Sequence, residues 1–151
     1  MIMHAEWGGR ELLEGADVLD VFAGTGALGL EALSRGAARA CFIESDPAAL
    51  RALRANVAAC KAEDRAEVLA LDALEVRRAT GCAKLALLDP PYGLDLVPRA
   101  LTRLQRVGRV GPDTLVVAET GRVESWSPDH PILEERLYGA ARVVIFRPGK
   151  S

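Results

Sequence analysis

Apolar and polar residues follow two alternating patterns along this 151-residue chain. Short apolar runs, which are typical of buried strands, alternate with stretches in which apolar residues recur every three or four positions, as on one face of a helix. The apolar runs predict strands at residues 16–24, 38–45, 66–73, 83–89 and 113–120. The periodic stretches predict helices at residues 27–37, 46–62 and 94–107. Two further apolar runs within residues 132–146 predict a terminal hairpin.

Residues that begin and end helices support these limits. Asp46 and Pro47 stand in the order preferred for an N-cap and the first helical position. Gly36 can end the preceding helix, and Pro98 fits the first turn or two of the last one. Strands that alternate with helices predict right-handed β-α-β units. We therefore expect an α/β fold, a doubly wound Rossmann-like sandwich whose mostly parallel seven-stranded sheet ends in a C-terminal antiparallel hairpin.

Carboxylates stand where several of the predicted strands end. In doubly wound sheets, ligands bind outside the carboxyl ends of the strands, near the point where the strand order reverses. We expect Asp20, Glu44, Asp72 and Asp89 to line this rim together with the residues up to Gly26.

Three glycines follow the first predicted strand in G-x-G-x-x-G spacing: Gly24, Gly26 and Gly29. Glycines allow a tight turn and let backbone N–H groups approach a ligand closely. Glu44 lies twenty residues beyond Gly24, where a carboxylate can accept hydrogen bonds from both hydroxyl groups of a ribose. Strand, glycines, helix and carboxylate together predict a site for a nucleoside cofactor.

The glycine spacing alone does not identify that cofactor. A nicotinamide dinucleotide fits it, and so does S-adenosylmethionine. Asp20 places a carboxylate where it would attract a cationic amino group and repel a pyrophosphate. Asp72 could accept a hydrogen bond from an adenine amino group. The carboxylates therefore favour S-adenosylmethionine.

The fourth predicted strand ends in the sequence DPPY, which comprises Asp89, Pro90, Pro91 and Tyr92. This sequence resembles the D/N-P-P-Y/F/W motif of class I S-adenosylmethionine-dependent methyltransferases that modify planar nitrogens. The stretch VLDVFAGTGALGLEALSRGA closely resembles bacterial 16S rRNA guanine-N2 methyltransferases of the RsmD type, as do IESD and YGAARVVIF. The resemblance runs from about Asp17 to Arg147.

The chemistry of methylating an aromatic amine explains the motif. Such an amine is a poor nucleophile because its lone pair is delocalised into the ring. The Asp89 carboxylate and the Pro90 carbonyl could accept its two hydrogens and favour a pyramidal nitrogen, and prolines keep the acceptor aimed. Tyr92 offers a face on which an unstacked base can rest. Catalysis then consists mostly of alignment in a dry site, without a strict need for a general base.

The resemblance also implies site residues and a partner. The catalytic residues would be Asp89, Pro90, Pro91 and Tyr92. The residues that bind S-adenosylmethionine would be Asp20, Phe22, Gly24, Thr25, Gly26, Leu28, Gly29, Glu44, Ser45, Asp72 and Ala73. The partner would be ribosomal RNA or the small-subunit ribonucleoprotein.

Composition narrows the picture further. A net charge of -2 argues against a protein held to nucleic acid by bulk positive charge. Four arginines, Arg99, Arg103, Arg106 and Arg109, could contact phosphate, but we favour the solvated face of a helix. We interpret the three cysteines as small buried side chains and expect no metal site. No run is long enough for a membrane span, so we expect a cytoplasmic monomer.

Residues 1–151 are expected to form a single class I methyltransferase domain in which the N-terminal segment of the family is largely absent. Two alternatives stay open. One is an N-methyltransferase for DNA adenine or a protein glutamine, and the other is a non-catalytic module that binds the cofactor and lacks its N-terminal arm. A nicotinamide-dependent dehydrogenase is disfavoured because no catalytic His, Tyr or Lys is evident near the rim.

Overall fold

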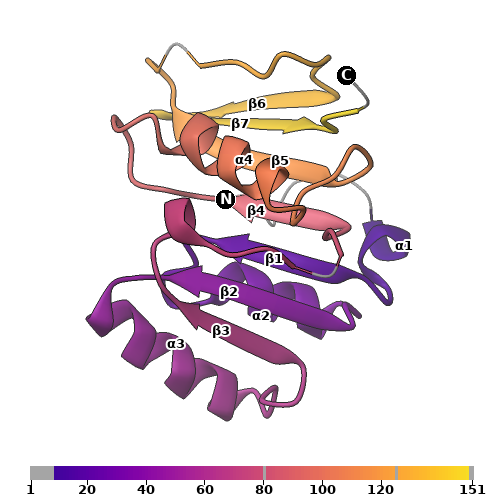
Figure 1. Ribbon diagram of the computed structural model, residues 1–151, viewed down its shortest axis with the longest axis vertical. Coiled ribbons are helices and arrows are strands. Elements are labelled where there is room, and N and C mark those ends of the chain that lie inside the picture. Colours follow the sequence, from indigo (N-terminus) through magenta and orange to yellow (C-terminus); the bar gives the residue numbers. More distant parts are fainter. Residues whose placement is uncertain (1–8, 80, 125, 150–151) are drawn as a thin grey trace.

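The computed structural model describes residues 9–79, 81–124 and 126–149. Residues 1–8, part of the N-terminal stretch in which the segment of the family was expected to be largely absent, lie outside them. Seven strands form one sheet in the order β3-β2-β1-β4-β5-β7-β6 (Figure 1). The strands are β1 (Asp17–Val21), β2 (Arg39–Glu44), β3 (Ala66–Ala70), β4 (Leu85–Leu88), β5 (Leu115–Gly121), β6 (Glu134–Tyr138) and β7 (Ala141–Phe146).

Strands β1 to β5 are mutually parallel, and β7 runs antiparallel to both β5 and β6. This arrangement confirms the predicted α/β class, the mostly parallel seven-stranded sheet and the antiparallel C-terminal hairpin. The second strand of the hairpin, β7, is the one that pairs with β5, so β6 forms the sheet edge.

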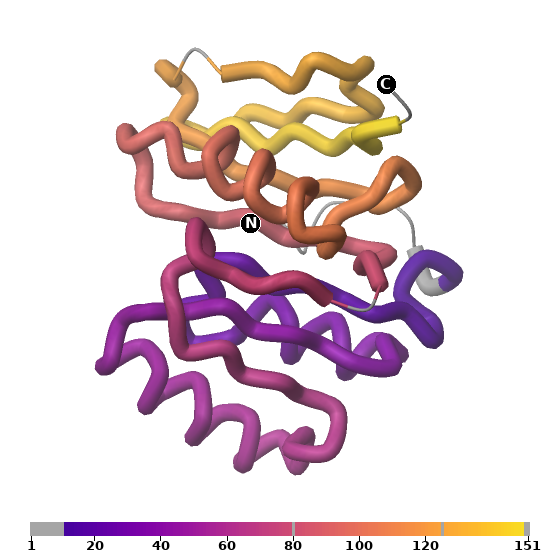
Figure 2. The backbone as a smooth tube through the Cα atoms, viewed as in Figure 1, coloured from indigo at the N-terminus to yellow at the C-terminus, as the bar shows by residue number. Residues whose placement is uncertain are grey.

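Helices cover both faces of the sheet (Figure 1). They are α1 (Gly9–Leu13), α2 (Ala27–Ser34), α3 (Pro47–Ala59), the 3-10 helix η2 (Ala73–Glu75) and α4 (Leu96–Arg106). Buried residues of α2 and α3 belong to one apolar core, and those of η2 and α4 belong to the other. Figure 2 shows η2 and α4 side by side, although twenty residues separate them in the chain.

Several predicted strands were too long, because the chain leaves the sheet before the apolar run in the sequence ends. Strand β1 stops at Val21, since Phe22 adopts a φ of 60° that no strand permits. Strand β3 stops at Ala70, and Asp72 then caps η2. The predicted start of α3 is confirmed, because the Asp46 side chain accepts a hydrogen bond from the N–H of Ala49 at 2.8 Å.

The interpretation of the cysteines was wrong, and that of the arginines holds only in part, for the exposed Arg99 and Arg106. Cys60 and Cys82 are exposed and Cys41 is only half-buried, because Cys60 ends α3 and Cys82 lies in the loop before β4. The four arginines are not simply a solvated face: Arg103 and Arg109 are half-buried and bind backbone carbonyls of the segment after η2.

Among the described residues, no helix combines the length and the apolar character that a membrane crossing would require.

Candidate functional site

The strand order reverses between β1 and β4, so the loops that follow these two strands meet at one edge of the sheet. The first of them carries the glycines. Gly24 has a φ of 59°, and Gly26, with a φ of 83°, forms the N-cap of α2. A Cβ on Gly29 would lie 2.4 Å from the ring of Phe42, so this glycine lets α2 pack closely against β2. The first two glycines thus shape the turn and the third serves packing.

Glu44 ties the glycine loop to the turn after β2. One of its carboxylate oxygens accepts a hydrogen bond from the N–H of Gly24 at 2.7 Å. The other accepts from the N–H groups of Ser45 and Asp46 at 3.0 and 2.9 Å. Ser45 and Thr25 are exposed beside this junction, while Phe22 and Leu28 are half-buried. A half-buried carboxylate held in this way has a fixed orientation toward a ligand on the loop.

Asp20 does not lie on the open rim where it was expected. It belongs to β1, it is only 1% exposed, and its carboxyl group accepts a hydrogen bond from the N–H of Gly29 at 2.9 Å. Burial raises the pKa of Asp20 to about 8, against the opposing effect of the Gly29 hydrogen bond and with smaller contributions from Asp89 and Glu44. Its side chain supports the glycine loop from inside the fold.

Asp72 and Ala73 stand at the predicted place after β3. The Asp72 side chain is exposed, and it accepts a hydrogen bond from the N–H of Leu74 at 2.8 Å, which fixes the start of η2. Ala73 is buried, at 3% exposure. Asp72 is therefore accessible to a ligand, and the Ala73 side chain packs into the core.

The DPPY sequence follows β4 directly. Asp89 and Pro91 are exposed, Pro90 is buried, and the Tyr92 ring is 45% exposed. Although Asp89 is exposed as a residue, partial burial of its carboxyl group and the neighbouring Glu119 together raise the pKa of Asp89 to about 6. Neutral pH lies only about one unit above this pKa, so the Asp89 carboxyl group is mostly ionised there.

Residues of β5 and the turn after it hold this segment in place, and sequence reasoning missed them. The Tyr92 hydroxyl donates a hydrogen bond to Glu119 at 2.8 Å. The N–H of Gly93 donates to Glu124 at 2.9 Å, and the N–H of Gly121 donates to the second oxygen of the same carboxylate. A Cβ on Gly121 would lie 3.4 Å from the Tyr92 ring, so the ring packs on the backbone there.

Register explains why Glu119 meets the DPPY sequence. Leu88 pairs with Ala118, so the next residues on the two strands, Asp89 and Glu119, are neighbours on the same face of the sheet. Knowing that β5 lies next to β4 would have sufficed to find Glu119. The sequence alone carries no signal for that neighbour.

Comparisons with known proteins identify the family of this chain and relate its fold to solved structures. A family model described as conserved hypothetical protein 95 matches residues 2–147. Ribosomal RNA small subunit methyltransferase D of Escherichia coli is 38% identical over 117 residues, which cover 77% of this chain but only 58% of that protein.

Two solved structures share the fold. A conserved hypothetical protein of Streptococcus pyogenes superposes with a TM-score of 0.77 at 30% identity, covering 87% of this chain and 85% of that one. An RNA methyltransferase from Salinibacter ruber, in complex with S-adenosyl-L-homocysteine, superposes with a TM-score of 0.71 at 21% identity, covering 92% and 85%. Because the family model spans nearly the whole sequence, this chain belongs to the conserved hypothetical protein 95 family, that of the RsmD-type methyltransferases.

Proposed function

We propose that this chain transfers a methyl group from S-adenosylmethionine to the exocyclic N2 amine of a guanine in small-subunit ribosomal RNA. The observation that carries the proposal is the position of Asp89 to Tyr92. A carboxylate, a prolyl carbonyl and a half-exposed aromatic face stand together at the end of β4, beside the glycine loop at the end of β1. The name of the Escherichia coli relative supports the RNA substrate.

The residues of the glycine loop fit the cofactor. Apart from its two chain neighbours, no heavy atom of the described residues lies within 4 Å of the position that a Cβ on Gly24 would take, so a ligand can approach this backbone. Glu44 is held beside it, and a cationic group would favour the ionised form of the buried Asp20. Asp72 offers a further exposed acceptor. When bound, S-adenosylmethionine would supply a methyl group that its sulfonium activates.

The residues of the DPPY segment would prepare the amine. The Asp89 carboxylate and the Pro90 carbonyl would each accept one N–H of the amino group, so that the nitrogen lone pair points away from the ring. Tyr92, whose hydroxyl is fixed on Glu119, would support the base. On methylation, the amine nitrogen would have to lose one of its two hydrogens as a proton. The Asp89 carboxylate would accept a hydrogen bond from one of them and could take up that proton.

Calorimetric titration with S-adenosylmethionine and, separately, with NAD tests the cofactor. We expect micromolar binding of S-adenosylmethionine alone. Transfer of an isotope-labelled methyl group to small-subunit RNA, naked and assembled, followed by nucleoside analysis, tests the substrate. N2-methylguanosine is the expected product. N6-methyladenosine, or label only on protein, would overturn the proposal of a guanine target while leaving methyl transfer established.

A further inference from the structure

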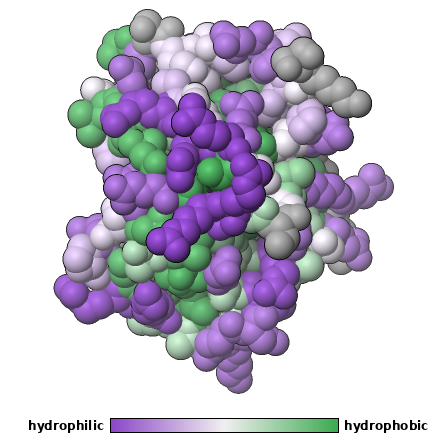
Figure 3. All heavy atoms as spheres, viewed as in Figure 1, coloured by the Kyte–Doolittle hydropathy of each residue, from purple (hydrophilic) through white to green (hydrophobic). Residues whose placement is uncertain are grey.

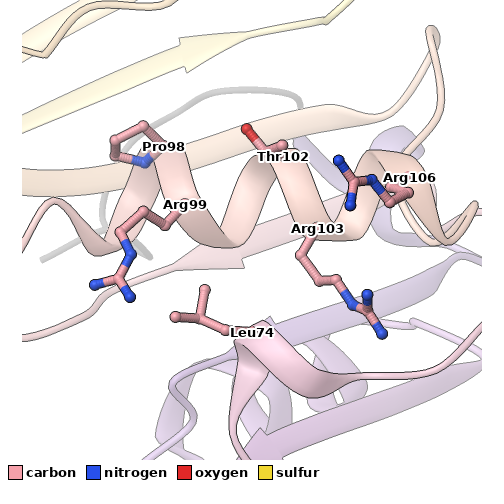
Figure 4. Close-up of a pocket in the computed structure, with 6 residues that line it drawn as sticks. All are labelled: Leu74, Pro98, Arg99, Thr102, Arg103 and Arg106. Carbon is pink, nitrogen blue, oxygen red and sulfur yellow. The ribbon is translucent and has the colours of Figure 1, made fainter.

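Arginines gather on the face of the molecule that α4 and η2 cover. Arg99, Arg103 and Arg106 line a hollow of about 470 Å³ between these two helices, together with Leu74, Pro98 and Thr102 (Figure 4). Arg77, Arg78 and Arg109 flank it, since Arg109 donates a hydrogen bond to the carbonyl of Arg77 and Arg78 to that of Arg106. In Figure 3, strongly hydrophilic residues gather on this face.

Backbone contacts hold two of these side chains in place. The Nε atom of Arg103 donates to the carbonyl of Val76 at 2.9 Å, and the Nε atom of Arg109 donates to that of Arg77 at 2.7 Å. The Nε contact leaves the terminal nitrogens of Arg103 without a hydrogen-bond partner among the described residues, so they can bind a bidentate acceptor. One terminal nitrogen of Arg109 donates to the Cys41 sulfur at 4.0 Å, which leaves the other available. Arg99 and Arg106 are exposed on the same side of α4. The guanidinium groups are thus partly ordered before any partner arrives.

The positive charge on this face is not neutralised within the described part of the chain. None of the six arginines forms an ion pair there; the ion pairs of Arg35, Arg136 and Arg142 lie elsewhere. Like charges three or four residues apart on a helix cost a few tenths of a kcal/mol each. Such a cluster in a chain of net charge -2 therefore suits an external polyanion.

The cluster also adjoins the candidate site. Helix α4 begins three residues after Gly93, and Arg99 donates a hydrogen bond to the carbonyl of Leu94 at 3.4 Å. Arg99, Arg103 and Arg106 succeed one another along one side of α4, over about 10 Å of helix axis. An elongated anion on this face would therefore run toward the DPPY segment.

We infer that this arginine surface, formed by residues 77, 78, 99, 103, 106 and 109, binds the phosphate backbone of the RNA whose base enters the DPPY site. The inference rests on the proposed function for the identity of the polyanion. In this view, the arginines contact phosphate groups and position the RNA, and they do not read its base sequence. The arginines of this face would attract RNA locally, although the chain as a whole has a net charge of -2.

The test compares two double variants of equal charge. Arg99→Gln with Arg106→Gln removes two exposed cations from the arginine surface. Arg51→Gln with Arg54→Gln removes two exposed cations from α3, on the opposite face of the sheet. The probe is an in vitro transcript of small-subunit ribosomal RNA, and its affinity is measured between 50 and 200 mM salt without cofactor.

Loss of two phosphate contacts should lower the slope of log affinity against log salt by about 1.4 to 1.8. Over this fourfold salt range, the wild-type protein should therefore lose roughly tenfold more affinity than the Arg99/Arg106 variant. The Arg51/Arg54 variant should behave like the wild type. Equal effects of both variants, no effect of either, or no RNA binding by the wild type at low salt would each overturn the inference.

The proposed function is measured separately. Titration with S-adenosylmethionine and methyl transfer at saturating RNA depend on the glycine loop and on Asp89, so both should survive in the Arg99/Arg106 variant. Unchanged RNA affinity of the Arg99/Arg106 variant, together with intact methyl transfer, would overturn the inference about the arginine surface and leave the proposed function standing. Absence of methyl transfer in the wild-type protein would instead overturn the proposed function.

Discussion

The two halves of the rim use their carboxylates in opposite ways. In the glycine-loop half, Asp20 and Glu44 accept hydrogen bonds from the backbone N–H groups of Gly29 and Gly24. In the DPPY half, Glu119 and Glu124 accept hydrogen bonds from Tyr92 and Gly93, while Asp89 stays exposed. In the first half, Asp20 and Glu44 already accept backbone hydrogen bonds and fix the shape of the glycine loop. The second keeps one acid available for a substrate and takes its rigidity from β5.

Replacing Asp89 should have the largest effect, because this is the carboxylate that the DPPY half leaves available for the reacting amine. We expect Asp89→Ala to lower the turnover number of methyl transfer by about a hundredfold or more, since it removes an acceptor aimed at the reacting amine. The affinity for S-adenosylmethionine should stay within about twofold of the wild type. Asp89→Asn, which keeps one acceptor, should retain part of the rate. A hundredfold loss of cofactor affinity in Asp89→Ala would show that the two halves are not separate.

Replacing Glu44 should affect binding and spare the chemical step. Glu44→Ala leaves the N–H groups of Gly24, Ser45 and Asp46 without their acceptor. Hydrogen bonds to a charged group contribute about 1.5–3 kcal/mol, so calorimetry should show cofactor affinity reduced about 10- to 100-fold. Turnover at saturating cofactor should change little.

Glu63→Ala provides the control for that variant, because Glu63 is exposed in the loop after α3 and should leave affinity unchanged. If Glu44→Ala instead lowered turnover and left affinity intact, Glu44 would belong functionally to the DPPY half.

Asp20 should affect stability in a pH-dependent way. Its pKa is raised from 3.8 to about 8 in the folded protein. The folded state then holds a proton that the unfolded state releases. Stability should therefore fall as pH rises between these values, by up to about 1.4 kcal/mol per pH unit. Asp20→Asn cannot ionise and can still accept from Gly29, so its urea unfolding should lack this contribution.

Asp17→Asn, on the exposed start of the same strand, serves as the control and should follow the wild-type pH dependence. Equal pH dependence in Asp20→Asn and the wild type would show that Asp20 is ionised in the folded state. The glycine-loop half would then hold a true buried charge.

The two halves also differ in how far the sequence predicts them. Gly24, Gly26 and Glu44 could be placed from local spacing, because a strand, a turn and a helix follow one another in the chain. Even there, the sequence put Asp20 on the rim, although the strand predicted at residues 16–24 runs past it, since spacing alone does not show that its side chain faces α2. Glu119 and Glu124 could not be found, because their contacts depend on which strand lies beside β4.

The charge of Glu119 should set the acid limit of activity, and this effect should be the smallest. Methyl transfer should be fastest when Asp89 is ionised, so the rate should fall below about pH 6 in the wild type. Glu119→Gln removes the neighbouring negative charge, so the pKa of Asp89 should fall and the midpoint should move to lower pH by up to about one unit. The Gln side chain can still accept the Tyr92 hydroxyl, so the rate near pH 8 should stay within a few-fold. Tyr92→Phe removes the hydrogen bond that Glu119→Gln retains and leaves the charge of Glu119 in place, so its pH–rate profile should match that of the wild type. A shift to lower pH in Tyr92→Phe as well would contradict the assignment of the effect to the charge of Glu119.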